Sequence, residues 1–311
     1  MKTVETTPLE ENSLEVFDRV IFPFKRNEMK GALDQEGSVM ALSKTEVVTI
    51  PPTMSIKGAA ETMTRYRFRR LPVTDPGTNR LLGIIGSSDI IDFLGGGDKF
   101  KVIKKKHKGN FLAAINESVR EIMMQDVVSL DASATLDDGL KTLLSSRVGG
   151  VVITQNNRVV GILTEKDFVS LMAEKVTGKK VEDYMTRNVV SATLGMTLGD
   201  VAKTMTRNSF RRLPVLSKGD LIGIITTRHI VDFIGRNSVF AKIVKNEVQE
   251  VLKTRAREIM DENVAVVSKD TDIGEAAKIM RERKTGTVCV VDNGRLVGIL
   301  TERDIVRAVG E

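Results

Sequence analysis

The sequence has 311 residues, of which 41% are hydrophobic and 28% are charged, a balance typical of a folded protein with about two globular domains. No apolar run approaches the roughly 18 residues of a membrane span, and no apolar signal core opens the chain, so we expect a cytoplasmic protein with no membrane segment. The single cysteine excludes a disulfide framework and a cysteine metal cluster, while the net charge of +6 favours anionic partners such as phosphates.

Residues 1–40 match no other part of the chain, and we expect them to form an N-terminal extension. After them, one unit recurs four times. We number the units 1 to 4 and place them at residues 41–96, 119–174, 181–236 and 256–311, with linkers at 97–118 and 237–255.

The four units alternate in type. Residues 119–174 align with 256–311 without a gap, whereas the motif Phe-Arg-Arg-Leu-Pro-Val occurs in units 1 and 3, at 68–73 and 210–215. Odd units therefore resemble each other more than their neighbours. This pattern indicates that an already paired unit was doubled.

Unit 2 shows the expected order of elements. A β-branched strand at 127–130 precedes a helix whose leucines at 136, 140, 143 and 144 have helical spacing. Two strands, 151–154 and 159–163, flank an Asn-Asn turn, and Thr164 opens a second helix. The fold class is therefore α/β of the α+β type, with four β-α-β-β-α units. One unit of about 55 residues buries too little surface to be stable alone, so we expect the units to pair.

The repeated motifs resemble the CBS domain. They are Glu-Ile-Met at 121–123 and 258–260, Arg-Leu-Pro-Val in the odd units, and Gly-Ile-Leu-Thr-Glu-Lys/Arg-Asp in the even units. Two CBS domains form a Bateman module. More narrowly, residues 92–97 and 110–116 resemble archaeal four-CBS proteins related to the γ subunit of AMP-activated protein kinase. The resemblance implies two modules closed into a flat disc, with clefts for AMP, ADP or ATP and no catalytic cofactor.

Each unit has a helix-start motif, where its last strand passes into its second helix. Thr164 with Asp167 and Thr301 with Asp304 have the spacing of a helix capping box. The resemblance implies a second role, in which Asp binds the ribose hydroxyls and Thr contacts ribose or phosphate. Both roles are compatible, since a capped helix start can also bind a ligand.

The odd helix-start motifs are less complete. Unit 1 keeps the acid, Asp89, but has Gly86 in place of threonine. Unit 3 keeps Thr226 but has His229 in place of aspartate. Because neutral imidazole cannot accept two hydrogen bonds from a diol, we expect the unit 3 site not to bind ribose in the usual manner.

Paired arginines, Arg69-Arg70 and Arg211-Arg212, precede the Leu-Pro-Val strands of the odd units. They could simply be solvated charges beside a strand. The resemblance implies phosphate binding, for which the planar guanidinium fork is suited. At the positions aligned with these arginines, the even units have Gly149-Gly150 and Gly286-Thr287. The odd-unit arginines would therefore bind the phosphates of nucleotides whose ribose is bound by another unit.

The first strand of each unit is expected to frame the adenine. Thr49, Ser129 and Ser191 align, and the apolar Val128 and Val190 precede the two serines. The small polar residue could equally mark the end of a strand. Unit 4 has Val266 in this register.

The leading hypothesis is a regulatory protein that binds adenine nucleotides and controls a partner enzyme or transporter. The hypothesis leaves open whether the protein forms a homodimer. It is not expected to be an enzyme, since no nucleophile–base pair, metal cluster or P-loop is present. S-adenosylmethionine is an alternative ligand. A lysine run at 101–108 leaves open nucleic-acid binding, which the 4% aromatic content disfavours.

Overall fold

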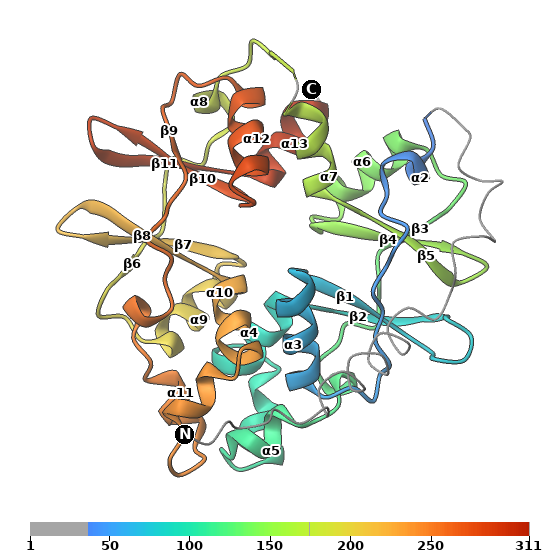
Figure 1. Cartoon of the computed structure of the whole chain (residues 1–311), viewed down its shortest axis with the longest axis vertical. Coiled ribbons are helices and arrows are strands. Elements are labelled where there is room, and N and C mark those ends of the chain that lie inside the picture. The colour runs from blue at the N-terminus through green and yellow to red at the C-terminus, as the bar shows by residue number, and fades with distance from the viewer. Residues whose placement is uncertain (1–36, 174, 311) are drawn as a thin grey trace, which may run out of the picture.

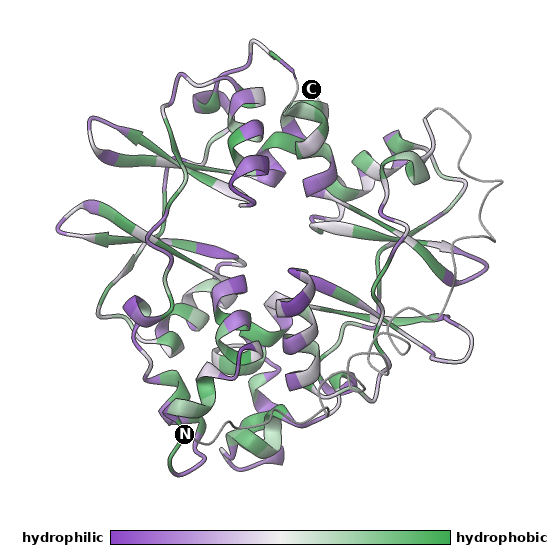
Figure 2. Cartoon of the chain, viewed as in Figure 1, coloured by the Kyte–Doolittle hydropathy of each residue, from purple (hydrophilic) through white to green (hydrophobic). Residues whose placement is uncertain are grey.

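A computed structural model describes residues 37–173 and 175–310. Most of the predicted extension, 1–40, therefore lies outside the described residues. The four units surround a common centre when viewed down the shortest axis of the molecule (Figure 1). Polar residues gather at the hairpin tips and at the element ends that face this centre (Figure 2). The expected α/β class is confirmed.

Three units have the predicted β-α-β-β-α order, and in unit 1 a single parallel bridge from Ile50 to Val73 replaces the first strand. The elements of units 1 and 2 are α3 (Ile56–Tyr66), β1 (Arg70–Thr74), β2 (Leu81–Gly86) and α4 (Ser87–Gly95), then β3 (Ser129–Asp131), α6 (Leu136–Ser145), β4 (Gly150–Gln155), β5 (Arg158–Thr164) and α7 (Glu165–Met172). Those of units 3 and 4 are β6 (Ala192–Thr193), α9 (Leu198–Arg207), β7 (Arg212–Ser217), β8 (Asp220–Thr226) and α10 (Thr227–Gly235), then β9 (Val266–Val267), α12 (Ile273–Glu282), β10 (Thr287–Asp292), β11 (Arg295–Thr301) and α13 (Glu302–Gly310).

Short elements surround the units. They are α2 (Val39–Leu42), the π-helix η2 (Val102–Lys106), α5 (Phe111–Ile115), the 3-10 helix η3 (Val119–Glu121), α8 (Val181–Tyr184), the 3-10 helix η4 (Ser238–Lys242), α11 (Val248–Leu252) and the 3-10 helix η5 (Ala256–Glu258). Linker 237–255 contains η4 and α11. The two linkers touch, because Phe111 donates its backbone N–H to the carbonyl of Asn246 over 2.9 Å.

Within the three-stranded sheets of units 2, 3 and 4, the middle strand pairs parallel with the first strand and antiparallel with the third. In unit 2, Val151 and Ile153 of β4 are fully buried and pack in one cluster with Leu143 of α6 and Phe168 of α7. The β-branched residues suit the sheet, and the helical leucine spacing brings one face of α6 to it. Cys289 is likewise a buried strand residue, and burial raises the pKa of its thiol to about 12.

Paired units exchange their leading segments. Lys44, near the start of unit 1, bridges Ile162 of unit 2, and Met124, ahead of the unit 2 strand, bridges Ile84 of unit 1. Glycine at position 83, in β2, permits this approach, since a Cβ on Gly83 would lie 2.9 Å from the sulfur of Met123. The same exchange links Thr186 to Ile299 and Asp261 to Ile224. Units 1 and 2 therefore form one module, and units 3 and 4 form the other.

The modules join through helices. Helices α3 and α4 of unit 1 pack on α10 and α9 of unit 3, while α7 of unit 2 packs on α12 and α13 of unit 4. Close approach again depends on glycine, because a Cβ on Gly95 of α4 would lie 2.8 Å from the Cβ of Ala202 in α9. One apolar cluster continues from unit 1 into unit 3. Because odd unit meets odd and even meets even, the four helix-start motifs converge on the centre.

Candidate functional site

The two even helix-start motifs have the same geometry. One carboxylate oxygen of Asp167, Oδ2, accepts hydrogen bonds from the backbone N–H and the hydroxyl of Thr164, at 2.7 and 2.6 Å. Asp304 accepts the same pair from Thr301, at 2.8 Å each. Both acids are buried, and this burial raises the pKa of each carboxyl. Their Oδ1 atoms make no hydrogen bond within the described part of the chain, so each can still accept one from a ligand hydroxyl.

The acid of unit 1 has both oxygens occupied. Oδ2 of Asp89 accepts the N–H of Gly86 over 2.6 Å, and Oδ1 forms an ion pair with the ammonium group of Lys99. Burial raises the pKa of Asp89, although Lys99 opposes that shift. A ligand hydroxyl would therefore have to displace Lys99 before Asp89 could bind it.

The third helix-start motif lines the large cleft between units 3 and 4, which has a volume of about 920 Å³. The hydroxyl of Thr226 accepts the backbone N–H of His229 over 3.3 Å and so caps α10. Burial lowers the pKa of the His229 imidazole. Its Nδ1 atom is buried and has no partner among the described residues.

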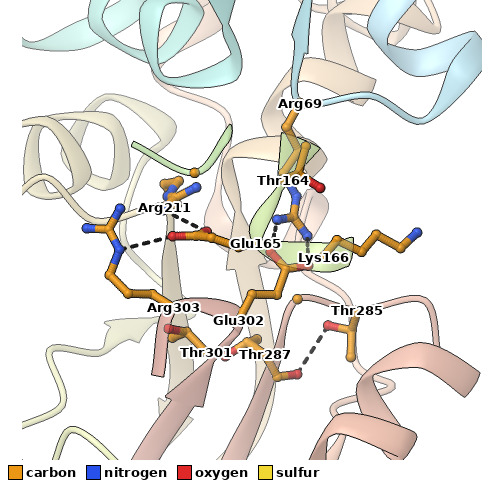
Figure 3. Close-up of polar contacts among 12 residues, drawn as sticks. Arg69, Thr164, Glu165, Lys166, Arg211, Thr285, Thr287, Thr301, Glu302 and Arg303 are labelled. Atoms are coloured by element: carbon orange, nitrogen blue, oxygen red, sulfur yellow. Dashed lines mark hydrogen bonds and ion pairs between the residues drawn. The ribbon is translucent and has the colours of Figure 1, made fainter. Parts of the chain in front are cut away.

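The four predicted arginines meet at the centre and contact the even units in two ways. Inside each module, Arg70 donates to the carbonyl of Gly149 over 2.5 Å, and Arg212 donates to that of Gly286 over 2.6 Å. Between modules, Arg69 forms a two-nitrogen ion pair with Glu302, and Nη2 of Arg211 lies 3.4 Å from Glu165 (Figure 3).

Glycine in the even units makes room for this arrangement. A Cβ on Gly149 would lie 2.4 Å from Nη1 of Arg211, and one on Gly286 would lie 2.3 Å from Nη2 of Arg69. The alternation of Arg-Arg with glycine along the sequence therefore reflects steric complementarity between odd and even units. Each odd unit supplies side chains that fill space left empty by the even units.

The central cluster consists of these four arginines with Glu165, Glu302, Lys166 and Arg303. Nε of Arg303 lies 3.0 Å from Glu165, which thereby contacts a second cation. Burial alone would raise the pKa of Glu302, but Arg69 and the neighbouring arginines lower it to about 2. Burial and nearby cations lower the pKa of Arg70 and Arg212 to about 10. With six basic and two acidic side chains, the cluster has an excess of positive charge that suits a polyanion.

A smaller cleft of about 210 Å³ lies between units 1 and 2. Thr164, Lys166, Arg69 and Arg70 line its charged part. Its apolar wall contains Val47, Val48 and two nearly parallel aromatic rings, Tyr66 and Phe68, with centroids 5.8 Å apart.

The predicted base-framing residues lie in different surroundings. Thr49 is buried, Ser191 is half-buried and Ser129 is exposed. In the two clefts, Val48 and Ala265 form the wall, each one residue before the aligned position. Val128 and Val190 occupy the equivalent register, and Val190 is 41% exposed. In these two clefts the wall thus contains the apolar residue just before the predicted base-framing position, Thr49 in unit 1 and Val266 in unit 4.

Sequence reasoning missed several residues of the site. Glu165 and Glu302 follow threonine in both even motifs, and that recurrence was a signal. Lys166 and Arg303 recur in the same way. No local sequence motif pointed to Tyr66, because its place in the wall of the smaller cleft depends on its packing beside Phe68. Among the described residues no group of His, Cys, Asp and Glu could hold a metal ion, and no helix is long and apolar enough to cross a membrane.

Four units joined as two pairs define a tandem-repeat protein built from two modules. The CBS domain model matches residues 39–96, 119–174, 181–236 and 256–311. The chain therefore belongs to the CBS-domain family, as the repeated motifs predicted.

The chain is similar to MJ1225 of Methanocaldococcus jannaschii, with 41% identity over 273 residues that cover 86% of this chain and 98% of that protein. The crystal structure of MJ1225, which has been proposed to be an archaeal homolog of g-AMPK, aligns with a TM-score of 0.83 over 88% of this chain and 99% of its own. A 33.4 kDa protein of Thermofilum pendens is 28% identical over 84% of this chain and 87% of its own. A Pyrococcus horikoshii protein, 21% identical with a TM-score of 0.56, covers 88% of this chain and 99% of its own and shares the fold. The predicted resemblance to archaeal four-CBS proteins is confirmed.

Proposed function

We propose that this CBS-domain protein is an energy-sensing regulator that binds AMP, ADP or ATP in the clefts between paired units and thereby controls a partner protein. The observation that carries the proposal is the recurrence of one arrangement. A buried aspartate with an available oxygen, at Asp167 and at Asp304, begins a helix beside an excess of guanidinium groups. A carboxylate suits the sugar hydroxyls, and guanidinium suits the phosphates.

The apolar wall of the smaller cleft supports adenine as the base. The rings of Tyr66 and Phe68, with Val48 beside them, offer a flat apolar surface to a heterocycle. Phe210 and Val190, the equivalents in unit 3, are 39% and 41% exposed and are available to a ligand at the Asp304 motif.

The charge of the central cluster favours nucleotides over the alternative ligand. S-adenosylmethionine carries a positive sulfonium group, and six basic side chains at the centre would repel it. The phosphates of a nucleotide would be attracted instead, with affinity expected to rise from AMP to ATP.

The proposed regulation uses the ion pairs between modules. Phosphates bound by Arg69 or Arg211 would compete with Glu302 and Glu165, which belong to the opposite module. Nucleotide binding would thereby loosen contacts between modules and change the surface that a partner enzyme or transporter meets. Coupling free energies of this kind are typically about 1–3 kcal/mol.

The structure gives a reason to disfavour nucleic-acid binding. Lys106 of the lysine run forms ion pairs with Glu117 and Glu121, and Lys101 forms one with Asp98. Lys104 lies over the ring of Phe100. Local partners thus neutralise part of a run that would otherwise contact a phosphate backbone.

The test is isothermal titration of the full chain with AMP, ADP, ATP, adenosine and S-adenosylmethionine. Replacing Asp167 and Asp304 together by Ala should remove adenosine binding, since each loses a charge-assisted hydrogen bond worth about 1.5–3 kcal/mol. Asp220→Ala, in an exposed hairpin of unit 3, is the matched control and should bind like the natural protein. Unchanged adenosine binding in the double variant would contradict the proposal. Light scattering with and without nucleotide tests whether a homodimer forms, and hydrolysis assays on the same samples test whether the nucleotides are turned over.

A further inference from the structure

The large cleft between units 3 and 4 has the charge of a phosphate site, but its helix-start motif has His229 in place of the acid. Nine basic and three acidic side chains line its roughly 920 Å³. This excess is greater than at the smaller cleft, where seven basic side chains face two acids.

Local ion pairs leave much of this charge uncompensated. Glu258 pairs with Lys242 over 2.5 Å, and Asp232 lies 3.8 Å from Arg228. In contrast, the side chains of Arg67, Arg236 and Lys284 form no hydrogen bond or ion pair among the residues that the structure describes. All three are exposed, so they can turn toward a ligand without first breaking another contact.

Arg228 connects these cations electrostatically. Its guanidinium is half-buried, and its pKa is lowered by burial and, despite Asp232, also by Arg67, Arg69 and Arg236. Repulsion among neighbouring cations is relieved when an anion with several charges binds between them. The cluster therefore favours a ligand with several phosphates over one with a single negative charge.

The sugar end of this cleft differs from the two even motifs. His229 stands where Asp167 and Asp304 stand in the other units, and it has no oxygen to offer a diol. The hydroxyl of Thr226 already accepts the backbone N–H of His229. Recognition in this cleft consequently depends on phosphate rather than on ribose.

We propose that the cleft between units 3 and 4 binds an oligophosphate chain through its phosphates alone, with Arg228, Arg236 and Lys284 as its principal contacts. The site is distinct from the proposed nucleotide sites at the Asp167 and Asp304 motifs and does not depend on them. It adjoins one of them, because Arg67, Arg69, Arg228 and Lys284 line both cavities. An oligophosphate in the large cleft would therefore weaken binding of a nucleoside triphosphate in the smaller one.

The experiment is isothermal titration of the full chain with inorganic tripolyphosphate. The natural protein should bind it, and Arg236→Gln/Lys284→Gln should bind at least tenfold more weakly. Arg158→Gln/Arg295→Gln, at two exposed hairpin arginines outside both clefts, is the control of equal charge change and should retain the affinity. All four substituted side chains are exposed, so thermal melting should be the same for the variants and the natural protein.

Two further arms separate this proposal from the nucleotide proposal. Saturating adenosine should not displace tripolyphosphate, and Asp167→Asn/Asp304→Asn should still bind tripolyphosphate after losing adenosine. His229→Asp should weaken tripolyphosphate binding, because it places a carboxylate among the phosphates. The proposal is overturned by an absence of binding, by equal affinity in Arg236→Gln/Lys284→Gln and in the Arg158→Gln/Arg295→Gln control, by displacement with adenosine, or by an unchanged affinity of His229→Asp.

Discussion

The ion pair between Arg69 and Glu302 yields a quantitative prediction for the variant Glu302→Gln. The Glu302 side chain is almost completely buried, and in the folded protein its pKa is about 2, compared with an ordinary 4.5. Each unit of pKa is worth about 1.4 kcal/mol, so the interactions of the ionised carboxylate stabilise the fold by about 3 kcal/mol at pH 7. Removing one partner of a buried ion pair typically costs about 3–5 kcal/mol, in agreement with the value of about 3 kcal/mol for Glu302.

The pH dependence follows from the same values. Because the pKa of Glu302 is lower in the folded than in the unfolded protein, its contribution is complete above pH 4.5 and is lost as the pH falls toward 2. At pH 3 about 1 kcal/mol of it should remain. The free energy of unfolding of the natural protein and of Glu302→Gln should therefore differ by about 3 kcal/mol at pH 7 and converge in acid.

The assay is urea denaturation of both proteins at several pH values. Asp137→Asn is the control, since Asp137 and Lys141 form an exposed pair, with 64% and 72% of their side chains accessible. Such surface pairs contribute about 0–1 kcal/mol. The reasoning would be refuted if Glu302→Gln matched this control at pH 7, or if its deficit were the same at pH 3.

Three further predictions test other parts of the site. Arg212→Ala should weaken ATP and ADP more than adenosine in titrations, because it removes a phosphate contact; equal losses for all three would count against a phosphate role. Gly286→Ala should destabilise the fold by about 1–3 kcal/mol in thermal melting, because its Cβ would displace Arg69 from Glu302. Gly195→Ala, whose Cβ would meet nothing within 4 Å, is its control, and equal melting temperatures would contradict the steric argument. Lys99→Gln should release Asp89 from its ion pair and add an adenosine site, which an unchanged stoichiometry would disprove.

The alternation of odd and even units has a physical consequence for assembly. Helices pair unit 1 with unit 3 and unit 2 with unit 4, so the two buried glutamates of the even units face each other across the centre. Glu165 and Glu302 would repel each other without counter-charges. Arg211 and Arg69 supply these charges from the opposite modules. In the odd units the equivalent positions are neutral, and the hydroxyls of Ser87 and Thr227 lie 2.9 Å apart. Exchanging an odd for an even unit would leave charges unmatched, which explains why the doubled pair keeps its order.

Features that arise within one unit were predictable from the sequence alone. Hydrophobic spacing and recurring motifs established the four units, their order of elements and their family. The bonds from Thr164 to Asp167 span three residues, and local spacing was enough to predict them. The gapless alignment of units 2 and 4 places Cys289 on Val152, and both are buried strand residues.

Tertiary structure alone decided which units share a cleft and which charges meet. Arg69 and Glu302 lie 233 residues apart, and no local pattern connects them. Thr49 aligns with Ser129, yet one is buried and the other exposed, because the surroundings of a strand end depend on the neighbouring unit. Lys99 reaches Asp89 only through the path of the chain after α4. Repeats that are alike in sequence thus acquire different sites, because each is completed by a different partner.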